Sequence, residues 1–409
     1  MPPALLQKLL RRFERNRTVT ISIGFNQGAS FVSALLLVTM LADHPLQYAI
    51  ALLAFAGFVS GAAASNTTAR IYANLKHAVN PESIARLALL LFCFEQVCSL
   101  LLTSIVIVVF APMTNFVTPL QAILLGASAS SGSLLAFSKY NAKALTRLNY
   151  FRGSIVVLRT TLILAAASWG KGEAIFAIVF ISFSLPTIFS LFLTLHLFIK
   201  GRSTDVVEQT GGSQSAESAV KVLREYAFGV PVAIARAFVN QGLIIVAVSI
   251  LSADELRIFR FLLIPKDLVN RTFNALLPLT FDRLYDSRPN RNRLLVIGFG
   301  AVALSCLWYV GGAIVLEYGY FDLLAFGVFM VMNLAVYTVL PIIWRAIYAD
   351  RALQNMAVVL FSLGALLGAG WISRPETVSG IFVLMSVYLL CYITLTIKIA
   401  GLSKYSDKT

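Results

Sequence analysis

Long apolar stretches alternate with short polar stretches along almost the whole of this chain of 409 residues. Each apolar stretch has about 17–26 residues, enough for a helix to cross about 30 Å of hydrocarbon. The windows are 20–41, 46–64, 87–112, 116–137, 153–169, 174–199, 226–251, 256–281, 294–316, 321–343, 352–372 and 377–400. This pattern predicts an all-α polytopic membrane protein with about twelve transmembrane helices.

The window 256–281 differs from the others because it carries a face of charged and amide side chains. At 100° per residue, Arg260, Asp267 and Arg271 lie within about 40° of one another around the helix. Two amides extend this face and a lysine lies at its margin: Asn270, Asn274 and Lys266. The opposite side is apolar: Phe261, Ile264, Leu268 and Val269. A charge at the membrane centre costs about 2.5–3.5 kcal/mol, so we expect the polar face to meet water, counter-charges or an anionic ligand.

Basic residues are distributed unevenly between alternate loops, and this distribution predicts the topology. The amino-terminal segment, every second loop and the carboxyl-terminal tail together hold 25, whereas the remaining loops hold three: Lys171, Arg257 and Arg374. The positive-inside rule then places both termini in the cytoplasm. A helix 256–281 lying on the membrane surface is the alternative to a spanning helix. It would move the arginines of 282–293 to the other side, so the charges favour a helix that crosses.

Composition supports the same class and argues against others. The chain is 58% hydrophobic and 13% charged with a net charge of +14, values typical of an inner-membrane protein and not of a soluble globule. Nucleic-acid binding is disfavoured because the basic residues are spread over short loops. The cysteines and histidines show no disulfide or metal spacing, and no phosphate-binding Walker loop occurs. We therefore expect no cofactor, and the remaining question is whether H⁺ or Na⁺ is coupled to transport.

A weak internal repeat predicts two lobes, 1–200 and 223–409, joined by a cytoplasmic linker at 201–222 that is rich in Ser, Gly and Gln. Three short matches recur in order at offsets of 214, 211 and 208 residues. They are Asn26-Gln27-Gly28 with Asn240-Gln241-Gly242, Ala42-Asp43 with Ala253-Asp254, and Tyr140, Lys143, Ala144 and Leu145 with Tyr348, Arg351, Ala352 and Leu353. A unit with an even number of helices repeats in parallel, with its axis along the membrane normal.

The seventh window adds a further cation to the polar face of the eighth. Arg236 and Asn240 share one face of that helix beside Pro231, whose missing N–H favours a kink. Together with Arg260, Lys266 and Arg271, Arg236 predicts a cationic vestibule for phosphate or an acidic sugar, because the planar guanidinium meets phosphate bidentately. The other interpretation is that some of these cations pair with Asp267 or extend to water.

The first half carries milder polar residues and one acid. Ser22, Asn26, Ser30 and Ser33 share a face of the first helix, and they either line a cavity or join helices to each other. Glu95 lies inside the third helix, where it couples transport to a cation, pairs with Arg159, or is a protonated buried acid. Asp267 is the second candidate for coupling.

On these features the chain resembles the polysaccharide flippases, the Wzx-type translocases of O-antigen and exopolysaccharide units in the multidrug/oligosaccharidyl-lipid/polysaccharide exporter superfamily. The resemblance covers nearly the whole chain and is one of architecture: twelve helices, a 6+6 duplication, and cations inside the carboxyl-terminal half. It implies two six-helix bundles around a central cavity. It also implies that an undecaprenyl-pyrophosphate-linked oligosaccharide crosses the bacterial inner membrane by alternating access, with membrane lipids and a polysaccharide polymerase as partners.

Three other classes compete with this interpretation. A drug/cation antiporter of the same superfamily favours acidic residues in the amino-terminal cavity, whereas the first helix here offers Asn26. A major-facilitator transporter usually carries a G-x-x-x-D-R-x-G-R-like signature between helices two and three, and 66–80 has none. A membrane-embedded glycosyltransferase or polymerase needs catalytic carboxylates or a large outer loop, so we expect no enzyme activity.

Overall fold

The computed structural model describes the chain in ten segments. They are 17–64, 81–109, 117–138, 142–204, 219–268, 303, 307–312, 326–332, 352–373 and 377–406. The helices are α2 (Arg17–Met40), α3 (Asp43–Ala63), α5 (Pro81–Val109), α6 (Pro119–Ala129), α7 (Gly132–Ser138), α8 (Ala142–Ser168), α9 (Ala174–Thr204), α10 (Ala219–Ala237), the π-helix η2 (Phe238–Gly242), α11 (Leu243–Ile250), α15 (Ala352–Ser373) and α16 (Val378–Ser406). Residues 253–268 are also helical, and these segments contain no strand.

Nine helical stretches in the described segments are long and apolar enough to cross a membrane, one of them interrupted between α6 and α7. They coincide with nine of the predicted windows, so the chain is a multi-pass α-helical membrane protein. The windows 256–281, 294–316 and 321–343 lie partly outside the described residues. The total of twelve helices and the lobes 1–200 and 223–409 therefore remain predictions.

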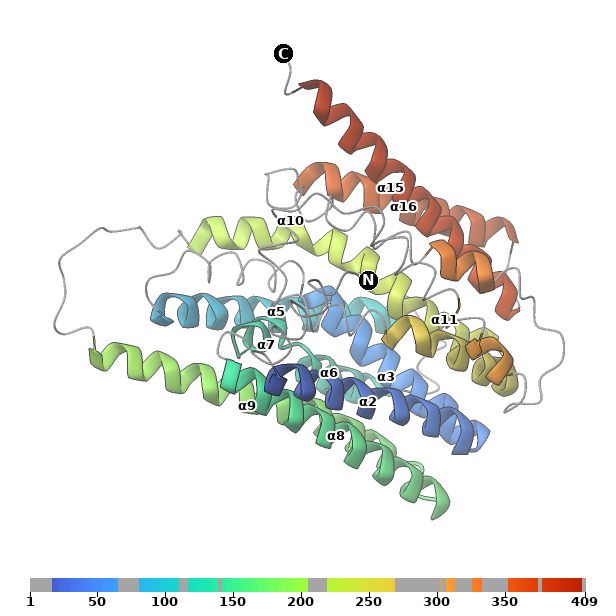
Figure 1. Ribbon diagram of the computed structural model, residues 1–409, viewed down its shortest axis with the longest axis horizontal. Coiled ribbons are helices and arrows are strands. Elements are labelled where there is room, and N and C mark those ends of the chain that lie inside the picture. The colour runs from blue at the N-terminus through green and yellow to red at the C-terminus, as the bar shows by residue number, and fades with distance from the viewer. Residues whose placement is uncertain are drawn as a thin grey trace, which may run out of the picture.

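Helix α3 is enclosed by other helices along most of its length. Its buried residues are Leu46, Ala49, Ile50, Ala51, Leu52, Ala54, Phe55, Ala56, Phe58, Val59, Ala62 and Ala63. It packs against α10, η2 and α11, and in Figure 1 α10 runs between the amino-terminal helices and the pair α15–α16. Small residues allow the close approach: a Cβ at Gly61 would lie 3.3 Å from the Cβ of Ala237.

Corresponding helices of the two halves contact each other crosswise, the second with the seventh and the first with the eighth. The second predicted helix, α3, packs on the seventh, α10 to α11, while the first, α2, contacts the eighth at 253–268 through Arg257. A two-fold relation between the halves would produce this pair of contacts. The glutamines of the matched Asn-Gln-Gly motifs, Gln27 and Gln241, both line one cavity, which is described below as the candidate site.

The fourth window, predicted as one helix over 116–137, is broken. Helix α6 ends at Ala129 and α7 begins at Gly132, with Ser130 and Ser131 outside both. Side chains of α5 form hydrogen bonds with backbone groups at this break. Glu95 accepts from the Ser133 N–H at 2.9 Å, and Gln96 donates to the Ser130 carbonyl at 2.5 Å. A break inside a membrane requires such partners because water is absent there.

Several helices also extend past the predicted windows. Helix α8 begins at Ala142, so Lys143, Arg147 and Arg152 lie within it and not in a loop. Helix α9 continues to Thr204 and α10 begins at Ala219. The ends of the predicted linker 201–222 are therefore helical, and 205–218 lie outside the described residues.

Candidate functional site

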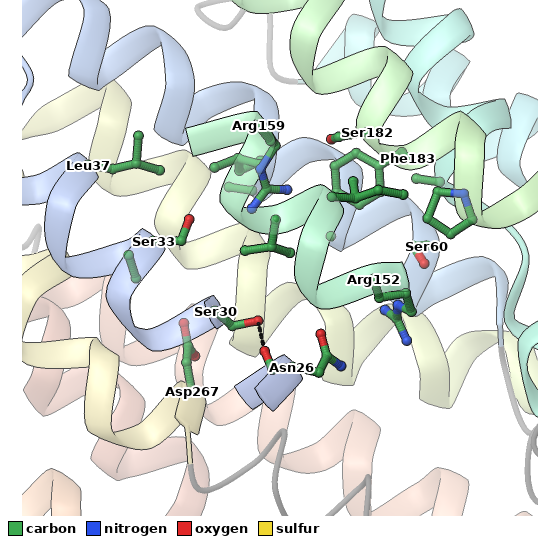
Figure 2. Close-up of a pocket in the computed structure, with 18 of the residues that line it drawn as sticks. Asn26, Ser30, Ser33, Leu37, Ser60, Arg152, Arg159, Ser182, Phe183 and Asp267 are labelled. Atoms are coloured by element: carbon green, nitrogen blue, oxygen red, sulfur yellow. Dashed lines mark hydrogen bonds between the residues drawn. The ribbon is translucent and has the colours of Figure 1, made fainter. Parts of the chain in front are cut away.

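A cavity of about 430 Å³ lies between helices of both halves of the chain. Its walls come from α2, α3, α6, α7, α8, α9, η2 and the helix at 253–268, and Figure 2 shows part of them. The lining residues with polar side chains are Asn26, Gln27, Ser30, Ser33, Ser60, Ser131, Asn149, Arg152, Arg159, Ser182, Gln241, Arg260 and Asp267. Its volume is within the range of about 300–1,000 Å³ that is usual for ligand pockets.

The polar face of α2 both lines this cavity and joins α2 to α8. Asn149 donates to the Ser22 hydroxyl at 3.2 Å, and the hydroxyls of Ser33 and Thr160 are hydrogen-bonded. These contacts share an offset of 127 residues, so the two helices run side by side in parallel. Asn26, Ser30 and Ser33 nevertheless line the cavity. Both interpretations of this face therefore describe part of it.

Two arginines of α8 that were not predicted as site residues also line the cavity. Arg152 and Arg159 are seven residues apart, about two helical turns, and so share a face, and Figure 2 shows both side chains. The constant offset between α2 and α8 places Arg152 near the level of Asn26 and Arg159 near that of Ser33. Arg152 precedes the predicted window 153–169, and Arg159 was predicted as a possible partner of Glu95. The signal that could have found them is the spacing Asn149, Arg152, Arg159 on one helix face.

The helix at 253–268 contributes an arginine and an acid to the same cavity. Arg260 and Asp267 both line it, and their side chains form an ion pair at 3.6 Å with 18% and 20% of their surface exposed. The described part of the predicted polar face thus meets a cavity and a counter-charge. Ile264, assigned to the apolar side, also lines the cavity.

Three other predicted site residues lie elsewhere in the described structure. Lys266 is 3% exposed, and its Nζ lies 5.8 Å from the centroid of the Phe329 ring. It follows Arg260 by six residues and is rotated by about 120° from it around the helix. Arg236 donates to the Tyr392 hydroxyl at 3.3 Å. Asn240 is an exposed residue of η2. None of the three is among the cavity-lining residues, whereas Arg271, Asn270 and Asn274 lie outside the described residues.

Glu95 has contacts that the sequence analysis did not consider. It is fully buried, and its carboxylate also accepts from the Ser133 hydroxyl at 2.8 Å. It therefore binds the first turn of α7, at the break in the fourth window. Arg159 lines the cavity and Glu95 does not.

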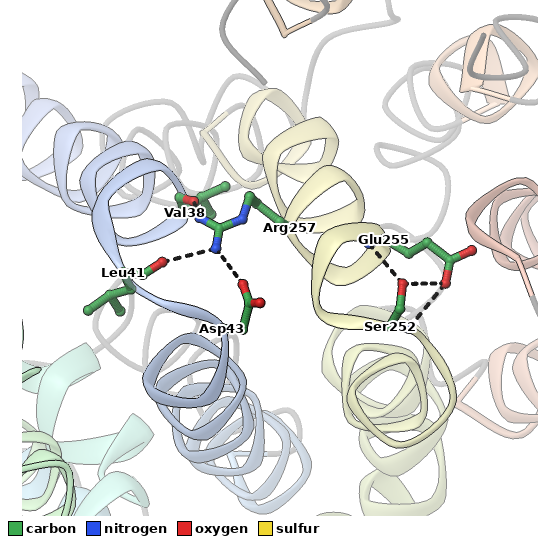
Figure 3. A network of polar contacts seen from close by, with 6 residues as sticks. All are labelled: Val38, Leu41, Asp43, Ser252, Glu255 and Arg257. Atoms are coloured by element: carbon green, nitrogen blue, oxygen red, sulfur yellow. Dashed lines mark hydrogen bonds and ion pairs between the residues drawn. The ribbon is translucent and has the colours of Figure 1, made fainter. Parts of the chain in front are cut away.

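A polar network ties the two halves together at the end of the cavity where α2 finishes. Arg257 donates to the carbonyls of Val38 and Leu41 at 2.6 and 3.0 Å, and to the Asp43 carboxylate at 2.9 Å (Figure 3). The last carbonyls of a helix have no partner within it, so one guanidinium completes the end of α2. Ser252 and Glu255 fix the start of the helix that carries Arg257, because each accepts from the backbone N–H of the other.

The cavity is apolar next to this network, where Leu37, Val38 and Ile50 line it. Its polar residues begin further along the helices, from Ser33 towards Asn26 on α2. The described site is thus apolar near the contacts of Arg257, and its polar interior holds three arginines and a single aspartate. Guanidinium, amide and hydroxyl groups suit an anionic, hydroxyl-rich ligand.

Comparisons of the chain with protein-family models, with curated proteins and with solved structures give no match. The described residues contain no group of three or more His, Cys, Asp or Glu that could hold a metal ion.

Proposed function

We propose that this protein is a flippase that moves an undecaprenyl-pyrophosphate-linked oligosaccharide unit across the bacterial inner membrane by alternating access. The observation that carries the proposal is the cavity between membrane-spanning helices, in which Arg152, Arg159 and Arg260 outnumber Asp267. A pyrophosphate has no favourable path through hydrocarbon. A charge-assisted contact to it is worth about 1.5–3 kcal/mol.

The neutral polar groups of the cavity suit the glycan. Asn26, Gln27, Asn149 and Gln241 offer amides, and the serines offer hydroxyls, which exchange hydrogen bonds with sugar hydroxyls. The prenyl tail stays in the lipid while the head crosses. No bond is made or broken in this scheme, so the protein acts as a transporter and not as an enzyme, with lipids and a polysaccharide polymerase as partners.

A drug/cation antiporter is the second candidate. A cavity for organic cations favours unpaired carboxylates and aromatic walls. Here Asp267 is paired with Arg260 at 3.6 Å, and the lining arginines raise the potential against a cation. The balance of charge favours an anionic substrate.

The test is a flipping assay in proteoliposomes that contain a prenyl-pyrophosphate-linked sugar with a fluorophore on the sugar. A membrane-impermeant quencher reaches only the outer leaflet, so flipping brings the protected half of the label to the quencher. We expect quenching of the protected half with the wild-type protein and a much slower signal with Arg159→Ala. Arg147→Ala, an exposed arginine on the same helix, is the matched control. Equal rates in protein-free liposomes, or efflux of a cationic dye in place of flipping, would overturn the proposal.

A further inference from the structure

The Arg260–Asp267 ion pair has an unusual geometry for two residues of one helix. Favourable pairs on a helix are three or four residues apart, whereas these are seven apart and about 10 Å along the axis. Both side chains must extend towards each other along the cavity wall. Even so, the closest nitrogen and oxygen are 3.6 Å apart, beyond the 2.7–2.9 Å of a good charge-assisted hydrogen bond.

Asp267 is the single carboxylate among the described residues that line the cavity. Arg152 and Arg159 reach the same space from the opposite wall (Figure 2). Without Asp267, three arginines and no carboxylate would line the described part of the cavity. The carboxylate lies where an anionic ligand of Arg260 would lie, and the loose pair leaves it displaceable.

We infer that Asp267 is a tethered competitor that sets the charge a ligand needs in order to bind. This inference rests on the proposed function, because it concerns the anion site of the same cavity. A group tethered near its partner acts like a free ligand at millimolar concentration. A monoanion at a lower concentration does not displace it from Arg260. A diphosphate does so, because it brings more charge and contacts Arg159 at the same time.

The same arrangement assists release. When the halves of the protein move apart, the diphosphate loses Arg159, and Asp267 again competes for Arg260. Removal of the carboxylate should therefore tighten binding and slow turnover together, which is not the signature of a residue that merely stabilises the fold.

The experiment measures binding by titration calorimetry to the purified full chain, with inorganic pyrophosphate and dimethyl phosphate as probes. Dimethyl phosphate has phosphate oxygens but a single charge. We expect the wild type to bind pyrophosphate in strong preference to dimethyl phosphate. Asp267→Asn should tighten the binding of dimethyl phosphate by about tenfold, which is the effect of one charged contact. It should tighten the binding of pyrophosphate by less. In the flipping assay it should lower both KM and kcat.

Two further variants keep the test decisive. Asp267→Glu retains the tethered charge and should restore the wild-type selectivity, while Asp254→Asn removes an exposed acid from the start of the same helix and should change nothing. If Asp267→Asn does not fold, Asp267→Ser removes the same charge. Unchanged selectivity in a folded neutral variant would overturn the inference and leave the proposed function standing. Absence of pyrophosphate binding in the wild type would overturn both.

Discussion

Two cations on one helix, six residues apart, have different surroundings. The side chain of Arg260 is 18% exposed to the cavity and paired with Asp267. Lys266 is 3% exposed and lies by the ring of Phe329. Arg236 of α10 is similar to Lys266, because it contacts the hydroxyl of Tyr392 and does not line the cavity. A charge in a transmembrane helix therefore indicates a ligand site only when its face of the helix meets a cavity.

The largest effect should come from the cavity side of this comparison. Arg159→Ala removes a guanidinium whose contact to phosphate is worth about 1.5–3 kcal/mol, so pyrophosphate binding should weaken by about ten- to a hundredfold. The thermal midpoint should change little, because the side chain lines a cavity. Calorimetry and a thermal melt of the same preparation measure both quantities.

Arg147→Ala is the control for this variant, since Arg147 is exposed on α8 outside the cavity. Arg159→Lys keeps the charge but not the fork, and should bind with intermediate affinity. Equal loss of binding in Arg147→Ala would show that the general positive charge of the protein matters, and not the cavity.

The buried side of the comparison predicts the opposite phenotype. Lys266→Met keeps the length of the side chain and removes a cation from an apolar environment. We expect unchanged pyrophosphate binding and a thermal midpoint that is equal or higher, because burying a charge is costly. Loss of binding at normal stability would place Lys266 with the ligand instead.

Sequence periodicity predicted the features of the fold that depend on one helix alone, namely its length and hydropathy. Nine windows became helices able to cross a membrane, because length and hydropathy are local properties. The break between α6 and α7 was not predictable in this way. It depends on Glu95 and Gln96 of another helix, which satisfy the backbone at Ser133 and Ser130.

The site was predicted less completely, for a related reason. Arg260 and Asp267, which helical periodicity placed on one face, line the same cavity, and so does Asn26 of α2. Periodicity could not tell which side of a helix meets a cavity, because that depends on how helices pack. Arg152 and Arg159 were missed although their spacing marked one face, and Lys266 was included although it packs against Phe329.

A smaller effect is expected from the Arg257 network, which joins the end of α2 to the helix at 253–268. Arg257→Ala removes two hydrogen bonds to the end of α2 and the partly exposed pair with Asp43. Such a pair contributes about 0–1 kcal/mol, and each carbonyl contact somewhat more. The halves should separate more often at this end.

Cysteine labelling measures that separation. A cysteine at Leu41, which is 3% exposed, should react several-fold faster with a membrane-impermeant thiol reagent when Arg257→Ala is also present. The comparison uses a chain whose native cysteines are replaced by alanine. Lys171→Ala is the control, a basic residue of the turn between α8 and α9. An equal increase in both variants would exclude a specific role for the Arg257 network.

The smallest effect on flipping is expected for Glu95, which is buried between helices, whereas Asp267 lines the cavity. Glu95→Gln keeps the shape of the side chain, and its carbonyl oxygen still accepts from the Ser133 N–H. The Ser133 hydroxyl can rotate to accept from the new amide, but its own hydrogen then loses the carboxylate that accepted it. We expect a loss of stability on the order of 1 kcal/mol, with flipping and its pH dependence preserved.

The pH profile of flipping distinguishes this role from coupling: a flattened profile at normal protein levels would make Glu95 a proton-coupling residue. If Glu95 acted by balancing Arg159, the double change to glutamine would recover what the single change lost. Because Glu95 contacts the first turn of α7 and Arg159 lines the cavity, we expect the two changes to add independently.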